Sequence, residues 1–220
     1  MHDNMVGDEL EILDQEPHRP SVIVISDFVC PWCYIGLMEV ERLKQEYDFD
    51  VHFAPYLLRP DTPPEGMPAR RVVAPDAPPA PQEQRAEVLG IRLTRGRTTT
   101  SCSQLALEAA EFAFQYSEDP WAYYKRLFKA YFEDLEDIGD VDVLVRAGEE
   151  VGIHGPSLRE ALVERRYQQT IYEGIQWSRS IGVTAIPTFV FNERLGMVGA
   201  QELPALRDMM HRVGNPPRTC

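Results

Sequence analysis

The feature that most constrains the fold is a short apolar run that leads directly into a Cys-x-x-Cys motif. Residues 21–28 contain consecutive β-branched side chains without helical spacing, which predicts a strand buried on both faces. The motif follows at once as Cys30-Pro-Trp-Cys33. Pro31 suits the first position of a helix, and apolar residues recur at helical spacing over residues 37–43. Cys30 is therefore expected at a strand-to-helix junction.

The rest of the chain adds elements in an order that indicates an α/β fold. The elements expected after the first helix are a strand over 50–58, helices within 101–180 that include 141–151 and 157–179, a hairpin over 187–199 and a last helix over 203–213. The predicted order is therefore β-α-β, a helical block, then β-β-α.

One segment is too rich in proline for regular structure. Residues 60–81 hold eight prolines, which exclude a helix or an inner strand there. We interpret the segment as a long surface connection and assign it no chemistry.

Charge and hydropathy exclude several classes of protein. The 220-residue chain has a formal net charge of −13, which makes it acidic and a poor binder of nucleic acid. Its longest apolar run has the length of a strand, whereas a membrane span needs about 20 residues, so no membrane anchor is expected. Residues 1–20 lack the basic start and apolar stretch of a secretory signal. We interpret them as an acidic N-terminal arm and expect a cytoplasmic location.

The four cysteines are Cys30, Cys33, Cys102 and Cys220, too few and too unevenly spaced for a disulfide-stapled scaffold. A single Cys-x-x-Cys pair supplies half of a zinc site, and no second pair or His-x-x-x-His supplies the rest. No metal site is expected. Cys102 is predicted to be a small buried residue, and Cys220, the final residue, to be exposed and mobile without a redox role.

The position of Cys30 favours thiol chemistry. Unpaired N–H groups and the positive end of the helix dipole stabilise a thiolate at a helix N-terminus, which lowers the pKa of the thiol. Cys33, one turn further in, is expected to be less exposed. At this spacing the two sulfurs can close a small disulfide ring, so Cys30 can attack a partner disulfide and Cys33 can resolve the mixed intermediate.

Two segments carry a family resemblance. Residues 27–36, Asp-Phe-Val-Cys-Pro-Trp-Cys-Tyr-Ile-Gly, resemble the active-site segment of the DsbA-like branch of the thioredoxin superfamily, and within that branch the FrnE-type oxidoreductases are most similar. Residues 182–191, Gly-Val-Thr-Ala-Ile-Pro-Thr-Phe-Val-Phe, resemble the loop that faces the cysteines in this superfamily, with Pro187 as its cis-proline. The resemblance implies a thioredoxin fold with a large helical insertion.

This resemblance also implies a domain organisation. The expected parts are an acidic arm at 1–20, a thioredoxin-fold domain at 21–59 and 181–213, a proline-rich connection at 60–100 and an inserted helical domain at 101–180.

The same resemblance assigns site residues. It implies catalytic roles for Cys30 and Cys33 and substrate-binding roles for Pro31, Trp32, Ile186 and Pro187. Trp32 is expected to supply contact surface, and the backbone of Ile186 to hydrogen-bond an extended peptide as an added strand.

Asp27 leaves two interpretations open. It is either a proton relay near Cys33 or an exposed carboxylate at the end of a strand.

The predicted function is that of a protein thiol–disulfide oxidoreductase. It would act on thiol- or disulfide-containing proteins or peptides, and glutathione is a further expected partner. No cofactor is expected beyond the Cys30–Cys33 disulfide, and no nucleic-acid or membrane partner. Neither the oligomeric state nor the redox direction is predicted.

Two alternatives remain open. One is a glutathione-dependent isomerase or transferase, because kappa-class glutathione transferases and 2-hydroxychromene-2-carboxylate isomerases resemble this architecture. Those relatives generally carry serine at the first cysteine position, so Cys30 favours redox chemistry. The other alternative is a redox-idle chaperone that uses the groove beside Pro187.

Overall fold

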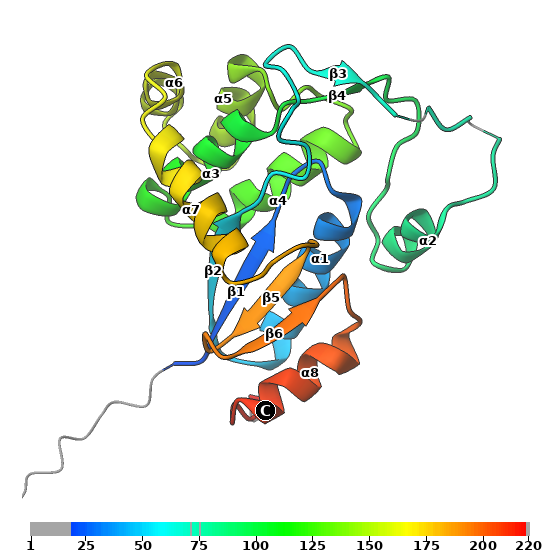
Figure 1. The fold of residues 1–220 in the computed structure, drawn as a ribbon, viewed down its shortest axis with the longest axis vertical. Helices are drawn as coiled ribbons and strands as arrows, with labels where there is room; N and C mark the ends of the chain where they lie inside the picture. Colours follow the sequence, from blue (N-terminus) through cyan, green and yellow to red (C-terminus); the bar gives the residue numbers. More distant parts are fainter. Residues whose placement is uncertain (1–18, 71, 75, 219–220) are drawn as a thin grey trace, which may run out of the picture.

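The computed structural model describes residues 19–70, 72–74 and 76–218. The predicted acidic arm lies almost entirely outside the described residues, and so does Cys220. Figure 1 shows a central sheet with two helices beside it, a group of helices at one end of the sheet and a long irregular segment that extends to one side. Within the described part of the chain, no helix is long and apolar enough to cross a membrane.

The central sheet has four strands in the order β2-β1-β5-β6. β1 and β2 are parallel, whereas β5 is antiparallel to both of its neighbours, β1 and β6. The strands are β1 (Ser21–Ser26), β2 (Asp50–Pro55), β5 (Thr188–Phe191) and β6 (Leu195–Val198). With α1 (Pro31–Glu46) and α8 (Leu203–Arg212), they form the predicted β-α-β and β-β-α halves, joined in one sheet.

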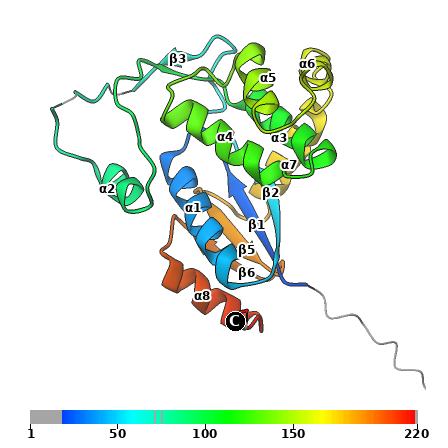
Figure 2. The ribbon, with the colours of Figure 1, turned by 180° about the vertical axis from the view of Figure 1, so that it is seen from behind.

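The two faces of the sheet are covered differently. Val24 lies opposite Phe53 and Phe189, and all three side chains belong to the large apolar core beneath α1 and α8. Figure 2 shows these two helices side by side on that face. Ile25 and Ala54 face the opposite side, in a smaller cluster. The alternation of the strands thus buries both faces, as the β-branched run predicts.

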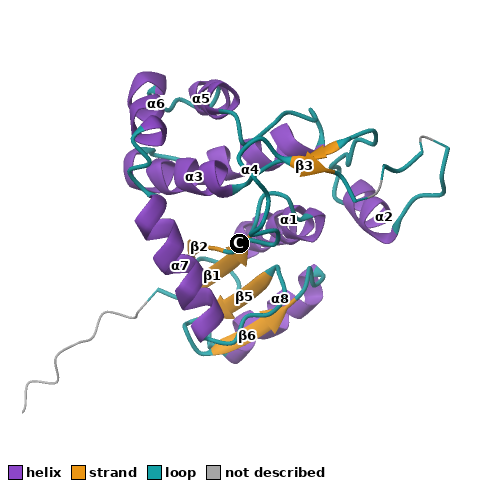
Figure 3. Ribbon diagram, turned by 45° about the horizontal axis from the view of Figure 1, so that its top comes forward, coloured by secondary structure: helices purple, strands orange, loops and turns teal. Residues whose placement is uncertain are grey.

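The helical block forms five helices. They are α3 (Gln104–Tyr116), α4 (Pro120–Phe132), α5 (Val141–Glu149), α6 (Gly155–Val163) and α7 (Gln168–Ser180). α7 extends from this block along β2, where the Ser178 hydroxyl donates a hydrogen bond to the Pro55 carbonyl at 3.1 Å (Figure 3). The edge of the sheet is therefore covered by the inserted helices near Pro55.

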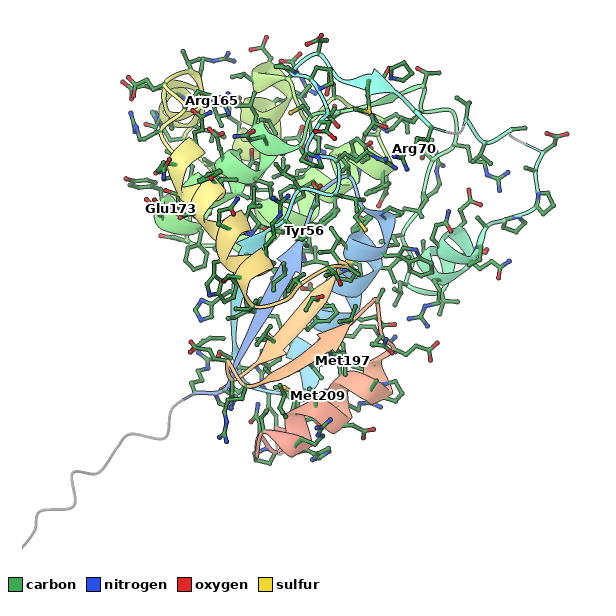
Figure 4. All side chains as sticks on the ribbon, viewed as in Figure 1. Tyr56, Arg70, Arg165, Glu173, Met197 and Met209 are labelled. Carbon is green, nitrogen blue, oxygen red and sulfur yellow. The ribbon has the colours of Figure 1, made fainter. Side chains whose placement is uncertain are left out.

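The single helix predicted over 157–179 is wrong, because the chain forms α6 and α7 with a break between them. Arg165 in the break has a φ of 53°, which no helix accommodates. Its guanidinium forms an ion pair of 2.7 Å with Glu108, whose side chain is fully buried in α3. Figure 4 labels Arg165 at this junction. The ion pair between Arg165 and Glu108 thus stabilises a turn at a place where the helical spacing of apolar residues continues in the sequence.

The proline-rich connection also contains regular structure. A helix, α2 (Pro81–Val88), and two short paired strands, β3 (Met67–Pro68) and β4 (Thr99–Thr100), lie within residues 60–100. Pro81 occupies the first turn of α2, and the Glu83 carboxylate accepts a hydrogen bond of 2.7 Å from the Ala80 N–H. Arg85 forms ion pairs with Glu39 of α1 and Glu202 at the start of α8. The connection is therefore held against α1 and α8.

Aromatic side chains join the sheet to the helical block. The Phe53 and Tyr124 rings stack with centroids 3.5 Å apart, and Phe28 contacts both Tyr124 and Phe128 of α4. The end of β1, from which the cysteine motif starts, is therefore fixed between the two parts of the molecule.

Candidate active site

The first cysteine lies at the start of α1. Cys30 is the N-cap residue, and its carbonyl accepts hydrogen bonds from the N–H groups of Cys33, at 3.0 Å, and Tyr34, at 3.3 Å. Its side chain does not cap the helix. Cys30 is 4 % exposed and Cys33 is 0 % exposed. The strand-to-helix position and the order of exposure both match the sequence prediction.

The pKa values of the two thiols are shifted in opposite directions. Hydrogen bonds from the side chain and backbone of Cys33 lower the pKa of Cys30, although burial and the nearby Asp27 oppose this effect. Burial raises the pKa of Cys33 well above its ordinary value, and its hydrogen bond to Cys30 adds to that rise. Cys30 is therefore the better nucleophile, while Cys33 keeps its proton until a base removes it.

Asp27 is fully buried behind the cysteines, which excludes the exposed carboxylate that the sequence left open. Its Oδ2 accepts a hydrogen bond of 2.7 Å from the Leu58 N–H. Burial raises the pKa of Asp27 to about 6, and hydrogen bonds from Ser103 and the backbone limit the rise. This carboxyl group therefore changes protonation closer to neutral pH than an exposed aspartate does.

Ser103 contributes to the site from the helical block, a contact that sequence reasoning missed. It is the N-cap residue of α3, yet its hydroxyl makes no capping bond. The side chain is 4 % exposed and hydrogen-bonds Asp27 instead. A serine before a helix usually predicts a cap, and only the tertiary structure shows that this hydroxyl has another partner.

Removing the Ser103 hydroxyl is expected to make Asp27 a weaker acid. Ser103→Ala deletes a hydrogen bond that favours the carboxylate, so the acidic limb of the pH–rate profile for thiol–disulfide exchange moves to higher pH by about one pH unit. The measurement is kcat/KM between pH 5 and 8. Ser103→Thr keeps the hydroxyl and serves as the matched control, expected to restore the wild-type profile. An unshifted profile in Ser103→Ala would exclude this role.

The second predicted segment lies against the first. The Ile186–Pro187 peptide bond is cis, and the Cys30 thiol donates a long hydrogen bond, 3.9 Å, to the Ile186 carbonyl. Pro187 is buried and Ile186 is partly exposed. The Ile186 carbonyl therefore faces the Cys30 thiol.

Gly36 permits this close approach of α1 to β5. A methyl group at Gly36 would lie 2.9 Å from Phe189 Cζ and 3.0 Å from Pro187 Cγ. Gly36→Ala is therefore expected to push the cysteine helix away from β5 and to lower the free energy of unfolding by about 1–3 kcal/mol.

Urea unfolding measures the cost of that substitution. The control is Gly196→Ala in β6, where a methyl group would meet no atom within 4 Å. This control should change the free energy of unfolding by less than about 0.5 kcal/mol. Equal stability of the two variants would show that the contact between α1 and Pro187 is not tight.

The remaining predicted residues are placed as follows. Pro31 and Trp32 are partly exposed at the first turn of α1, and Trp32 packs against the edge of the apolar core. Cys102 is only partly buried, so the prediction of a buried residue is corrected. Its neighbours Ser101 and Ser103 are buried. Among the described residues, no group of three or more His, Cys, Asp or Glu could hold a metal ion.

Comparison with known proteins identifies the family. The model of the DSBA-like thioredoxin domain matches residues 21–211. The chain belongs to this family. A relative of this DSBA-like domain, the uncharacterized protein YwbO of Bacillus subtilis (strain 168), is 31% identical over 172 residues, which are 77% of the chain and 86% of YwbO.

Solved structures show the same fold. The probable DsbA oxidoreductase SCO1869 of Streptomyces coelicolor has a TM-score of 0.75 and 19% identity, with 91% of the DSBA-like chain and 92% of SCO1869 covered. The cytosolic disulfide reductase DsbM of Pseudomonas aeruginosa, solved with GSH, has a TM-score of 0.64 and 17% identity, with 88% and 98% covered. A 2-hydroxychromene-2-carboxylate isomerase has a TM-score of 0.66 and 18% identity, with 88% and 96% covered. The predicted thioredoxin fold with a helical insertion is thus confirmed.

Proposed function

We propose that this DSBA-like protein is a protein thiol–disulfide oxidoreductase with Cys30 and Cys33 as its catalytic residues. The observation that carries the proposal is the pair of thiols at the start of α1, in which hydrogen bonds from Cys33 lower the pKa of Cys30. A nucleophilic thiol and a less acidic resolving thiol within one helical turn are what disulfide exchange requires.

The reaction begins when the Cys30 thiolate attacks one sulfur of a substrate disulfide. A mixed disulfide forms, and the other substrate sulfur leaves as a thiolate that takes up a proton. Asp27 then accepts the proton of Cys33, and the Cys33 thiolate attacks the Cys30 sulfur. The Cys30–Cys33 disulfide forms and the second substrate thiol leaves, so the substrate is reduced by two electrons. The reverse sequence oxidises a dithiol.

The contact surface in this proposal surrounds Cys30. Pro31 and Trp32 at the helix start, and Ile186 and Pro187 on the facing loop, would bind the chain that carries the reactive disulfide. The partners are thiol- or disulfide-containing proteins or peptides. Glutathione is included because DsbM was solved with GSH. The same proposal includes a cytoplasmic location, since DsbM is described as cytosolic. It also includes the FrnE type of oxidoreductase, whose active-site motif the chain resembles.

A second candidate is a glutathione-dependent isomerase, because a 2-hydroxychromene-2-carboxylate isomerase has the same fold. Such an enzyme would bind the glutathione thiolate and need no internal disulfide. The redox-idle chaperone also needs none. Both alternatives therefore predict activity without a second thiol.

The test is the reduction of a peptide disulfide by the reduced protein, with thiols counted by an alkylating reagent. The proposal predicts one Cys30–Cys33 disulfide formed per substrate disulfide cleaved. The Cys30→Ser, Cys33→Ser double variant is the control and should show no reaction. The proposal would be wrong if the wild type showed no disulfide exchange and the double variant kept an isomerase or chaperone activity. The corresponding alternative would then take its place.

A further inference from the structure

A cavity of about 200 Å³ opens beside the start of α1. Val29 and Pro31, the residues on either side of Cys30 in the chain, form one wall. The connection contributes residues 93–97, and the end of α4 contributes Tyr131 and Phe132. The cavity therefore adjoins the chain on both sides of Cys30, the residue that would carry the reacting sulfur.

Two arginines line the cavity, and they differ in their partners. The Arg95 guanidinium forms two hydrogen bonds, of 2.7 and 2.8 Å, with the Glu83 carboxylate, so these two charges cancel. The Arg97 guanidinium lies 3.8 Å from the centre of the Tyr131 ring. Its Nη2 donates to the carbonyls of Tyr131 and Glu136.

Unlike Arg95, Arg97 has backbone carbonyls and not a carboxylate as its direct partners. Among the described residues, it forms no ion pair with a carboxylate within 4.0 Å. Asp137 is the carboxylate that interacts with Arg97 at longer range, and its Oδ1 already accepts a hydrogen bond from the Gly139 N–H. A partly buried guanidinium with backbone carbonyls as partners gains more from an added anion than an exposed one does.

The positive charge of Arg97 is opposite in sign to the net charge of the chain. The protein carries a net charge of −13, yet the cavity beside Cys30 has one cation more than it has carboxylates. Because the Arg97 Nη2 already donates to two carbonyls, a carboxylate would bind Arg97 through its charge and its remaining N–H groups.

We propose that this cavity binds a carboxylate that the substrate carries within one residue of its reactive sulfur, with Arg97 as the ion-pair partner. This inference rests on the proposed disulfide exchange and adds a substrate class to it. The shared chemistry is a carboxylate next to a disulfide, which either an acidic peptide or a small acidic disulfide can supply.

Paired substrates test the inference. Two peptide disulfides differ only in an Asp or an Asn next to the reactive cysteine, and glutathione disulfide is compared with its methyl ester. The wild type should favour the Asp peptide in kcat/KM by about tenfold, the effect of one charged hydrogen bond. Preference within the peptide pair identifies a peptide source, and preference only for the free acid of glutathione disulfide identifies the small molecule.

Variants of two arginines provide the second comparison. Arg97→Gln should reduce the ratio of the acidic to the neutral substrate to about one, and Arg97→Lys should restore part of it. Arg92→Gln removes an exposed arginine outside the cavity and should leave the ratio unchanged. The ratio is informative even where a variant is less stable, because both substrates meet the same protein.

The outcomes separate the two proposals. Equal rates with acidic and neutral substrates in the wild type, or a preference that persists in Arg97→Gln, would overturn the carboxylate site and leave disulfide exchange intact. No exchange with any of the four substrates would overturn both.

Discussion

Replacing Cys30 by serine is expected to lower kcat/KM for disulfide reduction by at least about a thousandfold, because the attacking thiolate is lost. Replacing Cys33 by serine is expected to have a different effect. Cys30 still attacks, but nothing resolves the intermediate, so a mixed disulfide between Cys30 and the substrate accumulates. Intact-protein mass spectrometry after mixing with a peptide disulfide measures this adduct, and stopped-flow assays measure the rates.

Cys102→Ser is the matched control for these two variants. Cys102 is partly exposed and lies outside the first turn of α1, so its replacement should leave exchange within about twofold of the wild type. Accumulation of the adduct in Cys30→Ser, with none in Cys33→Ser, would reverse the assigned roles. Loss of exchange in Cys102→Ser would mean that a third thiol takes part.

Asp27 is expected to make the protein less stable as the pH rises toward neutrality. Folding raises the pKa of this buried carboxyl from 3.8 to about 6, so the folded protein binds the proton more tightly than the unfolded chain does. The resulting stabilisation is complete below pH 3.8 and is lost as the pH rises through 6. The loss amounts to about 3 kcal/mol, at 1.36 kcal/mol for each pH unit.

Asp27→Asn removes this dependence, because the amide does not titrate. Relative to the wild type, its free energy of unfolding should rise by about 2 kcal/mol between pH 4 and pH 7, whatever the constant cost of its altered hydrogen bonds. Urea unfolding at several pH values gives this difference. Asp208→Asn, at an exposed position of α8 outside the site, is the control and should show no such change.

The same substitution is expected to slow resolution of the mixed disulfide at neutral pH, since Cys33 loses its proton acceptor. The pH–rate profile should lose the limb near pH 6. The difference in stability between the two proteins could instead be constant with pH, and the rate profile unchanged. That result would show that the pKa of Asp27 is not raised and that Asp27 is not the base in this site.

The parts of the fold that depend on local pattern are those that the sequence predicts well. The β-branched run before Cys30, the proline after it and the apolar spacing of the next residues all act within a few positions, and the structure has β1 and α1 there. The hairpin of β5 and β6 is equally local. The family resemblance adds what local pattern does not, namely that Ile186 and Pro187 face Cys30.

The parts that were missed depend on contacts between distant segments. The apolar spacing continues through residue 165, and the helix breaks there because Arg165 turns toward Glu108. The α2 helix has local signals in Pro81 and Glu83, but no element was predicted for residues 82–100.

The surroundings of the candidate site could not be predicted from the sequence either. Asp27 looks like any carboxylate at the end of a strand until the Leu58 N–H and the Ser103 hydroxyl are brought to it by other elements. The cavity with Arg97 forms because the connection packs against α4, a contact that no single stretch of sequence encodes.

The central claim is that Cys30 and Cys33 form a redox couple, and a redox titration tests it most directly. The protein is equilibrated in glutathione buffers of graded ratio, Trp32 fluorescence is followed, and free thiols are trapped with an alkylating reagent. We predict one reversible two-electron transition between the thioredoxin value of about −270 mV and the DsbA value of about −120 mV. Absence of any Cys30–Cys33 disulfide across that range would contradict the claim.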